Sequence, residues 1–226
     1  MTNTNIYFSL VISVIAQVVT GIIEVSSLLI KVNSQYLFLK QLMILEVFVQ
    51  IIEAGFYLYW FNNFKKINNV TPTRYYDWVI TTPTMLLNLV FYLIFLKHKQ
   101  ENTSDKLNFF NLFKQESTTL IVIFVLNWLM LLFGYLAEMK KISTALGVML
   151  GFIPFFIYYF IIYDKYALLT KDGFIIYSYF LFFWSLYGLA ALMPYNIKNI
   201  IYNMLDLFSK NFFGIFLGYL IYKNKS

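Results

Sequence analysis

Seven long apolar stretches restrict the fold more than any other feature of this sequence. Their predicted limits are Ile6–Ile30, Leu37–Phe61, Tyr75–Leu96, Ser117–Leu136, Ser143–Tyr163, Gly173–Met193 and Ile197–Tyr222. A helix needs roughly 20 apolar residues to cross a hydrocarbon core about 30 Å thick. Only 12% of the residues are charged, against about 25% in soluble domains. The chain is therefore predicted to be an all-α, multi-pass membrane protein, with residues 1–226 forming one seven-transmembrane-helix bundle.

The distribution of lysines predicts the orientation of this bundle. Loops that carry more lysine and arginine tend to lie in the cytoplasm. If the N-terminus lies outside, the cytoplasmic side holds Lys31, Lys40, Lys97, Lys99, Lys106, Lys114, Lys165, Lys171, Lys223 and Lys225. The outer side then holds Lys65, Lys66, Lys140, Lys141 and Lys198. We therefore expect the N-terminus outside and the C-terminus in the cytoplasm, and the net charge of +6 reflects membrane topology rather than nucleic-acid binding.

Lys210 lies near the middle of the last apolar stretch, and Asp206 precedes it by one helical turn. An ammonium group at the centre of a membrane helix costs roughly 2.5–3.5 kcal/mol on insertion scales, so such a residue is a functional candidate. Positions four apart share one face of a helix, which makes Lys210 and Asp206 a candidate buried ion pair. A lysine held in this way can be deprotonated or can form a Schiff base with an aldehyde.

Arg74 is the only arginine in the chain, and it stands at the start of the third stretch with Asp77 one turn deeper. The planar guanidinium group can bridge carboxylates. Arg74 and protonated Lys210 would balance Asp77 and Asp206, and a neutral cluster of four groups is the least costly way to bury them. The alternative is that Arg74 extends from a helix end toward the lipid headgroups.

Two residues that follow Asp77 modify the local helix. Thr81 lies four residues after Asp77, so its hydroxyl is predicted to bond either that carboxylate or the preceding turn. Pro83 is predicted to free the carbonyl of Val79, which a neighbouring group must then satisfy. In the sixth stretch, Trp184 and Tyr187 share one face and are placed to enclose a flat conjugated ligand together with Trp78, although aromatic residues more often serve packing alone.

Together these residues resemble the signature of the microbial (type 1) rhodopsins. The motifs are Arg74-Tyr75-x-Asp77-Trp78-x-x-Thr81-Thr82-Pro83, Trp184-x-x-Tyr187 and Asp206-x-x-x-Lys210. The resemblance implies all-trans retinal bound as a Schiff base to Lys210, with photoisomerisation as the trigger. It also implies that Asp77 and Asp206 are counterions, with Asp77 accepting the Schiff-base proton. Arg74 and Thr81 would complete the counterion cluster, and the retinal pocket would include Trp78, Thr82, Trp184 and Tyr187.

The sequence departs from the proton-pumping members of that family. Asn88 occupies the position, eleven residues after the counterion, where a pump has a carboxylic proton donor. Lys198 stands where the pump archetype has a proton-releasing glutamate. Gly188 replaces a proline of many relatives, and Ala191 replaces a pocket tryptophan. The first two departures argue against an efficient pump, although water can replace a donor.

Three predicted spans carry polar residues at helical spacing. These are Ser9, Ser13, Gln17, Thr20 and Glu24 in the first span, Glu46, Gln50, Glu53 and Tyr57 in the second, and Asn196, Asn199, Asn203, Asp206 and Lys210 in the seventh. Polar faces inside a bilayer mark ion pathways, and carboxylates favour cations. Hydrogen bonding between helices is the alternative explanation, but it accounts poorly for Glu46 and Glu53, which have no basic partner if Lys210 and Arg74 are already paired. Glu24 is also placed to reach the headgroups beside Lys31.

The arrangement resembles more narrowly the group 1 rhodopsins of giant viruses, which include light-gated cation channels. This resemblance implies an ion pathway along Ser13, Glu46, Glu53, Asn199 and Asn203. We therefore expect a light-gated cation channel, not an enzyme, in a host-cell membrane. Its expected partners are retinal, lipid, and transported protons or monovalent metal ions, with a small homo-oligomer consistent with the family and no metal site or nucleic-acid partner.

A light-driven outward proton pump is the first alternative, a sensory rhodopsin the second and a retinal-free receptor or transporter the weakest. Replacing Glu53 by Gln is expected to alter conductance and spare colour.

Overall fold

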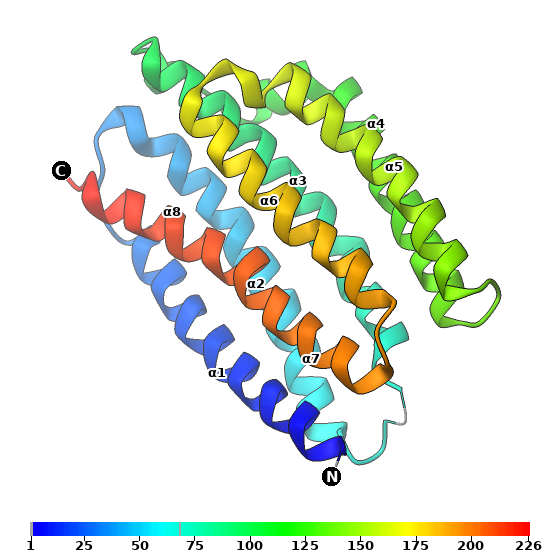
Figure 1. Cartoon of the computed structure of the whole chain (residues 1–226). Coiled ribbons are helices and arrows are strands. Elements are labelled where there is room, and N and C mark those ends of the chain that lie inside the picture. The colour runs from blue at the N-terminus through cyan, green and yellow to red at the C-terminus, as the bar shows by residue number, and fades with distance from the viewer. Residues whose placement is uncertain (1, 68) are drawn as a thin grey trace.

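The computed structural model describes residues 2–67 and 69–226, and it consists of membrane-length helices joined by short loops (Figure 1). The helices are α1 (Thr2–Leu28), α2 (Leu37–Asn63), α3 (Thr71–Gln100), α4 (Phe109–Glu138), α5 (Thr144–Lys165), α6 (Lys171–Ala191), α7 (Tyr195–Asp206) and α8 (Phe212–Lys223). A π-helical turn, η4 (Leu207–Asn211), joins α7 and α8 into one continuous span. Three short 3₁₀ turns, η1 (Ser34–Tyr36), η2 (Ser104–Lys106) and η3 (Ala167–Leu169), lie in the connections. Within the described residues, seven spans are long and apolar enough to cross a membrane, as predicted.

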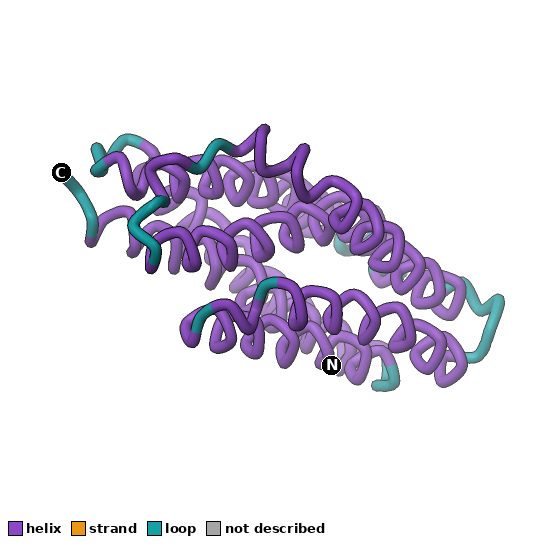
Figure 2. Tube along the Cα trace, turned by 90° about the horizontal axis from the view of Figure 1, so that it is seen from above, coloured by secondary structure: helices purple, strands orange, loops and turns teal. Residues whose placement is uncertain are grey.

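The helices lie roughly alongside one another in a bundle, with the two chain termini at opposite ends (Figures 1 and 2). We call these the N end and the C end of the bundle. Helix α3 is the most enclosed span, with 78% of its most apolar window buried, against 22% for α4. Central placement of α3 explains why its arginine and aspartate lie inside the protein rather than against lipid.

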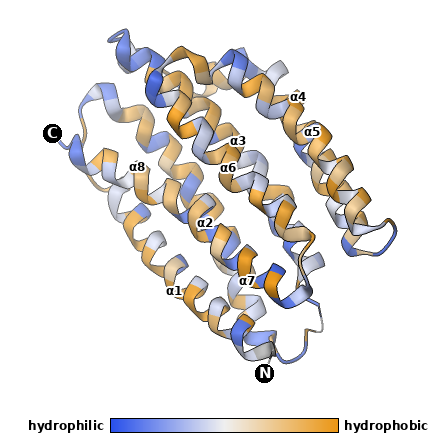
Figure 3. Cartoon of the chain, viewed as in Figure 1, coloured by the Kyte–Doolittle hydropathy of each residue, from blue (hydrophilic) through white to orange (hydrophobic). Residues whose placement is uncertain are grey.

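The outer surface is apolar, and polar residues lie mostly between the helices and at the two ends (Figure 3). Leu29, Phe110 and Met149 are among the most exposed side chains, as expected for a surface that faces hydrocarbon. The structural helices extend a few residues beyond most predicted limits, although α6 ends at Ala191 rather than Met193. Charged and polar residues form these extra turns because helices continue into the headgroup region. The orientation of the termini across the membrane stays a prediction.

Side-chain caps explain where three of the helices begin. The side chains of Asn108, Ser143 and Thr170 each accept a hydrogen bond from a backbone N–H three residues later. These contacts satisfy backbone donors that a helix leaves free in its first turn. The caps therefore fix the start of α4, α5 and α6.

Pro83 lies inside α3 and has the effect that its position predicts. It frees the carbonyl of Val79, which instead accepts a hydrogen bond from Trp128 Nε1 of α4 at 2.9 Å. A neighbouring helix therefore supplies the bond that the proline removes. This contact fixes α4 against α3 beside the cavity described below.

Candidate functional site

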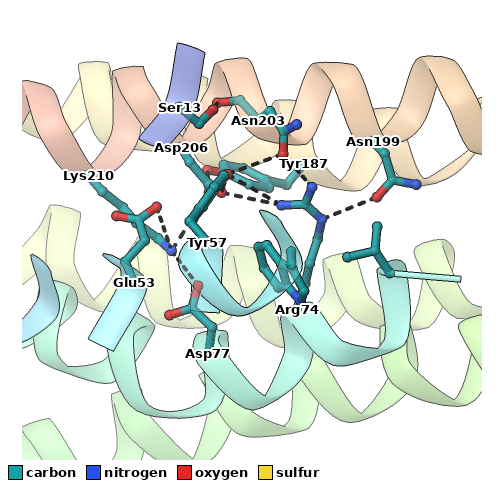
Figure 4. A network of polar contacts seen from close by, with 12 residues as sticks. Ser13, Glu53, Tyr57, Arg74, Asp77, Tyr187, Asn199, Asn203, Asp206 and Lys210 are labelled. Carbon is teal, nitrogen blue, oxygen red and sulfur yellow. Dashed lines mark hydrogen bonds and ion pairs between the residues drawn. The ribbon is translucent and has the colours of Figure 1, made fainter. Parts of the chain in front are cut away.

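Lys210 lies at the centre of a buried cluster of three carboxyl groups (Figure 4). Its Nζ is 2.8 Å from Asp77 Oδ2, 3.3 Å from Glu53 Oε1 and 3.8 Å from Asp206 Oδ1. The lysine side chain is only 3% exposed. The predicted pairing of Lys210 with Asp206 is present, but Asp77 on α3 is the closer partner.

Glu53 belongs to this cluster, which corrects the expectation that it has no basic partner. The cluster of four groups predicted from the sequence is present but incomplete, because a third carboxyl joins its two positive groups and two aspartates. These are Arg74 and Lys210 against Glu53, Asp77 and Asp206. One proton bound among the three carboxyls would make the cluster neutral, which is the less costly state for a group of buried charges.

The two aspartates are held very differently. Asp206 accepts hydrogen bonds from the hydroxyls of Tyr57 at 2.5 Å and Tyr187 at 2.6 Å, and it pairs with Arg74 Nη1 at 3.5 Å. Asp77 is bonded through Oδ2 to Lys210, while its Oδ1 has no hydrogen-bond partner. Asp206 is therefore fixed by several donors, and Asp77 is free to respond to a change at the lysine nitrogen.

Arg74 is buried, with 1% of its side chain exposed, so the alternative of a headgroup-reaching arginine is wrong. Its Nε donates to Asn199 Oδ1 at 3.2 Å, its Nη2 donates to Asn203, and its guanidinium lies 4.8 Å from the centre of the Trp60 ring. Among the described residues it forms an ion pair with Asp206 only. The expected bridge to both aspartates is thus half correct, since two asparagines occupy the other donors.

The two threonines of α3 bond to the backbone of their own helix. Thr81 Oγ1 donates to the carbonyl of Asp77 at 3.0 Å, the second of the two partners predicted for it. Thr82 Oγ1 donates to the carbonyl of Trp78 at 2.7 Å and accepts a hydrogen bond from Asn127 Nδ2 of α4 at 2.7 Å. Thr81 therefore supports the turn that carries Asp77, and Thr82 links α3 to α4.

A cavity with about 780 Å³ of space not filled by atoms begins at Lys210 and lies among α3, α4, α5 and α6. All four residues predicted for a ligand pocket line it, namely Trp78, Thr82, Trp184 and Tyr187. Small residues widen its far part, namely Gly134, Gly147, Gly151, Gly188 and Ala191. A Cβ atom at Gly188 would lie 2.6 Å from the ring of Phe152, so the proline of many relatives does not fit here without a shift of that ring.

A family model described as bacteriorhodopsin-like protein matches residues 4–224. The chain belongs to this family of microbial rhodopsins. Among solved structures, viral rhodopsin OLPVRII is 29% identical with a TM-score of 0.81, and the match covers 98% of this chain and 99% of that one. This likeness fits the predicted placement among viral rhodopsins. No curated protein matches the sequence.

More distant structures share the fold alone. A blue light-absorbing proteorhodopsin from Med12 is 15% identical with a TM-score of 0.75, covering 96% of this chain and 97% of that one. Xanthorhodopsin, described as a light-driven ion pump with dual chromophore, is 15% identical with a TM-score of 0.76, covering 99% and 94%. Membership of the family makes this rhodopsin a multi-pass integral membrane protein.

Retinal, bound covalently through a lysine Schiff base, is the cofactor of this family, and the cavity fits it. Lys210 provides an amine on one side, and aromatic side chains line much of the remaining, mostly apolar space, as is typical of small-molecule pockets. In this structure the free ammonium of Lys210 stands in for the Schiff-base nitrogen. Its contact with Asp77 accordingly shows which carboxyl is nearest to that nitrogen's position.

Of the residues predicted for an ion pathway, Glu53 lies beside Lys210 and the others lie on either side of it. Toward the N end, Ser13 Oγ donates to the carbonyl of Asn203 at 3.4 Å, and Asn199 accepts from Arg74. Toward the C end, Asn88 Nδ2 donates to Glu46 Oε1 at 2.5 Å. Asn88, which lacks the carboxyl of a pump's donor, is therefore bonded directly to one supplied by α2.

Sequence reasoning missed two contributors to the site. Tyr57 belongs to the polar face predicted for the second span, but the sequence does not indicate its hydrogen bond to Asp206. Asn127 is a fully buried amide in an otherwise apolar span, and it bonds Thr82 at the pocket. Its isolation among apolar residues is a signal that the sequence does contain.

Proposed function

We propose that this rhodopsin is a light-gated cation channel whose pathway runs between α1, α2, α3 and the α7–α8 span. The observation that carries the proposal is a line of buried polar groups along the whole bundle. Its members are Ser13, Gln17, Glu24, Glu46, Gln50, Glu53, Asn199, Asn203 and Asn211, each at most 6% exposed. Polar groups within a membrane protein face cavities or ion routes, and this line contains more carboxyls than cations.

Lys210 is proposed as the attachment point, and bound retinal supplies light absorption and an isomerisation that moves the Lys210 nitrogen. Asp77 is the acceptor of the proton on that nitrogen, because its Oδ2 lies 2.8 Å away and its Oδ1 is free of partners. Once Asp77 is neutral, the balance of charge around Arg74 and Asp206 changes. The cluster then has two arrangements whose populations light shifts.

Between the Lys210 cluster and the C end, three amides bond to one another across the proposed pathway. Gln17 of α1 and Asn211 of η4 exchange hydrogen bonds at 3.3 and 3.4 Å, and Gln50 of α2 donates to the Gln17 carbonyl at 2.8 Å. Amides can bond to water or to a cation as well as to one another. Rearrangement of these three side chains is the simplest local route by which α1, α2 and η4 admit water.

Carboxylates along the line select for cations. Glu46 is buried and bonded to Asn88, and Glu53 lies beside Lys210. Because the buried polar line named above contains three carboxyls and no basic side chain, the proposed permeant ions are protons or monovalent metal cations. The short contact of Glu53 with Lys210 revises one earlier expectation: Glu53→Gln should shift the absorption band as well as conductance.

Voltage-clamp recording under illumination tests the proposal. A channel current reverses when the cation gradient is reversed, whereas a current that stays outward at every voltage would reject the channel. Lys210→Ala tests the attachment point, because it should abolish the visible absorption band that forms when retinal is added. A band that persists in Lys210→Ala would move the attachment to another lysine.

A light-driven outward proton pump is the second candidate, and the Lys210–Asp77 contact favours it, because a pump needs an acceptor at this position. Asn88 weakens it, since an amide cannot donate a carboxyl proton. Acidification of an illuminated cell suspension, together with a current that does not reverse, would establish the pump instead.

A further inference from the structure

Glu24 of α1 is a buried carboxyl that the site described above does not use. Only 1% of the side chain is exposed, and Oε2 has no hydrogen-bond partner. The expectation that it reaches the headgroups beside Lys31 is therefore wrong.

The carboxyl of Glu24 lies directly against the backbone of α8. A Cβ atom at Gly214 would come within 2.7 Å of Glu24 Cδ, and closer still to Oε1. One turn later, a Cβ atom at Gly218 would lie 3.3 Å from Ile23 and 3.8 Å from Met43. Two glycines four residues apart thus let α8 approach α1 and α2 closely, a packing mode common between membrane helices.

Apolar side chains seal this contact on the side of the C end. Leu39 and Met43 of α2 and Leu217 and Ile221 of α8 are at most 1% exposed. Glu24 is 1% exposed while these side chains are packed, and a buried carboxyl oxygen without a partner is unfavourable. Separation of α8 from α1 would expose the carboxyl and relieve that cost.

We propose that the contact between Glu24 and Gly214 is the gate of the pathway at the C end, and that Glu24 is the carboxyl that a permeating cation meets there once light separates α1 from α8. This inference rests on the proposed channel function and adds a specific gate to it. The gate differs from the counterion cluster in position, since Glu24 follows Gln17 of the amide group on α1 by about two helical turns, toward the C end. The predicted topology makes this the cytoplasmic mouth.

The first experiment replaces Glu24 and records light-evoked currents at matched expression. Glu24→Gln keeps the shape and removes the charge, so the cation current should fall several-fold while the absorption band stays unchanged. Glu24→Asp should retain part of the current. A merely structural role predicts instead that pigment stability falls and that Asp gives no rescue. Wild-type current in Glu24→Gln would overturn the proposal.

The second experiment uses the close approach at Gly214. Gly214→Ala should displace the Glu24 carboxyl and produce a current in the dark. Adding Glu24→Ala frees the space for the new methyl group and should abolish that dark current. Gly218→Ala is the matched control, because its methyl group meets only apolar side chains and the Ser27 Cβ, and it should give no dark current. A dark current that Glu24→Ala fails to remove would reject the gate.

Infrared difference spectroscopy separates failure of the gate from failure of the channel. Illumination should shift a carboxyl band that is missing in Glu24→Gln. If the wild-type current never reverses but this band is present, the channel proposal fails. The inference that illumination exposes the Glu24 carboxyl is then retained. If the current reverses and no band belongs to Glu24, the channel stands and the gate is rejected.

Discussion

The polar interior differs on the two sides of Lys210. Toward the N end, Arg74, Asn199, Asn203, Tyr57 and Asp206 bond to one another, and none of their polar side-chain atoms is buried without a partner. Toward the C end, unpartnered atoms remain on the buried side chains of Glu24 and Asn88. Basic groups are concentrated on the first side, and carboxyls without a basic partner on the second.

This difference indicates which side is easier to open. A buried polar group without a partner costs about 1–3 kcal/mol, and entering water removes that cost. Opening the N side instead breaks a set of satisfied bonds around a buried guanidinium. We therefore expect light to hydrate the C side first, while the N side holds the cluster in place.

The largest expected effect comes from removing the guanidinium on the N side. Arg74→Ala leaves Asp206 with Lys210, at 3.8 Å, as its remaining cation, and removing one partner of a buried pair costs about 3–5 kcal/mol. Pigment yield and the thermal half-life of the visible band should both fall sharply. Arg74→Lys keeps the charge but loses the planar donor arrangement. Its pigment yield and thermal half-life should therefore lie between those of the wild type and of Arg74→Ala. Wild-type thermal stability in Arg74→Ala would show that the N side is not the rigid one.

The two aspartates offer a second test at the boundary between the sides. Asp206→Asn should destabilise the pigment by about 1.5–3 kcal/mol, the range for hydrogen bonds to charged groups, because Tyr57, Tyr187 and Arg74 all lose a carboxylate. Asp77→Asn should cost less stability and should move the absorption band to longer wavelength, since a carboxylate beside a protonated Schiff base stabilises its ground state. Thermal melts and absorption spectra of both variants test these expectations. Equal decreases in melting temperature would contradict the difference between the two aspartates.

A smaller effect is expected from neutralising the carboxyl of α2 on the C side. Glu46→Gln keeps an oxygen that can accept from Asn88, so the stability change should stay within about 1 kcal/mol. The light-evoked cation current should nevertheless fall, because a charge on the pathway is lost. A stability loss as large as that of Arg74→Ala would mean that the polar contacts on the two sides stabilise the protein equally.

The smallest effect is expected at Ser13. Its hydrogen bond to the Asn203 carbonyl is long, at 3.4 Å, and its removal in Ser13→Ala should cost no more than about 0.5 kcal/mol. Melting of the pigment tests this value. A greater loss would show that Ser13 supports the Arg74 group more strongly than this distance indicates.

The sequence predicts the bundle and much of the cluster for clear physical reasons. Membrane spans follow from the length of apolar runs, and buried charges such as Lys210 and Arg74 are rare enough to indicate a site. The contact between Glu53 and Lys210 was not predictable, because it depends on how α2 is rotated against η4. Similarly, the burial of Glu24 depends on Gly214, whose place opposite α1 is set by packing between distant parts of the chain.

The π-helical turn at Lys210 also fixes the phase of everything that follows it. One residue more or less in a helix rotates the next segment by about 100°. Deleting a single residue between this turn and Gly214, where the helix is regular, would bring Ile215 to the place of Gly214 and Tyr219 to that of Gly218, and both are bulky side chains that now face outward. The same short turn that holds the Lys210 amine among the carboxyls thus also aligns Gly214 and Gly218 with α1. An evolutionary change in this turn would therefore disturb both the amine site and the packing of the glycines.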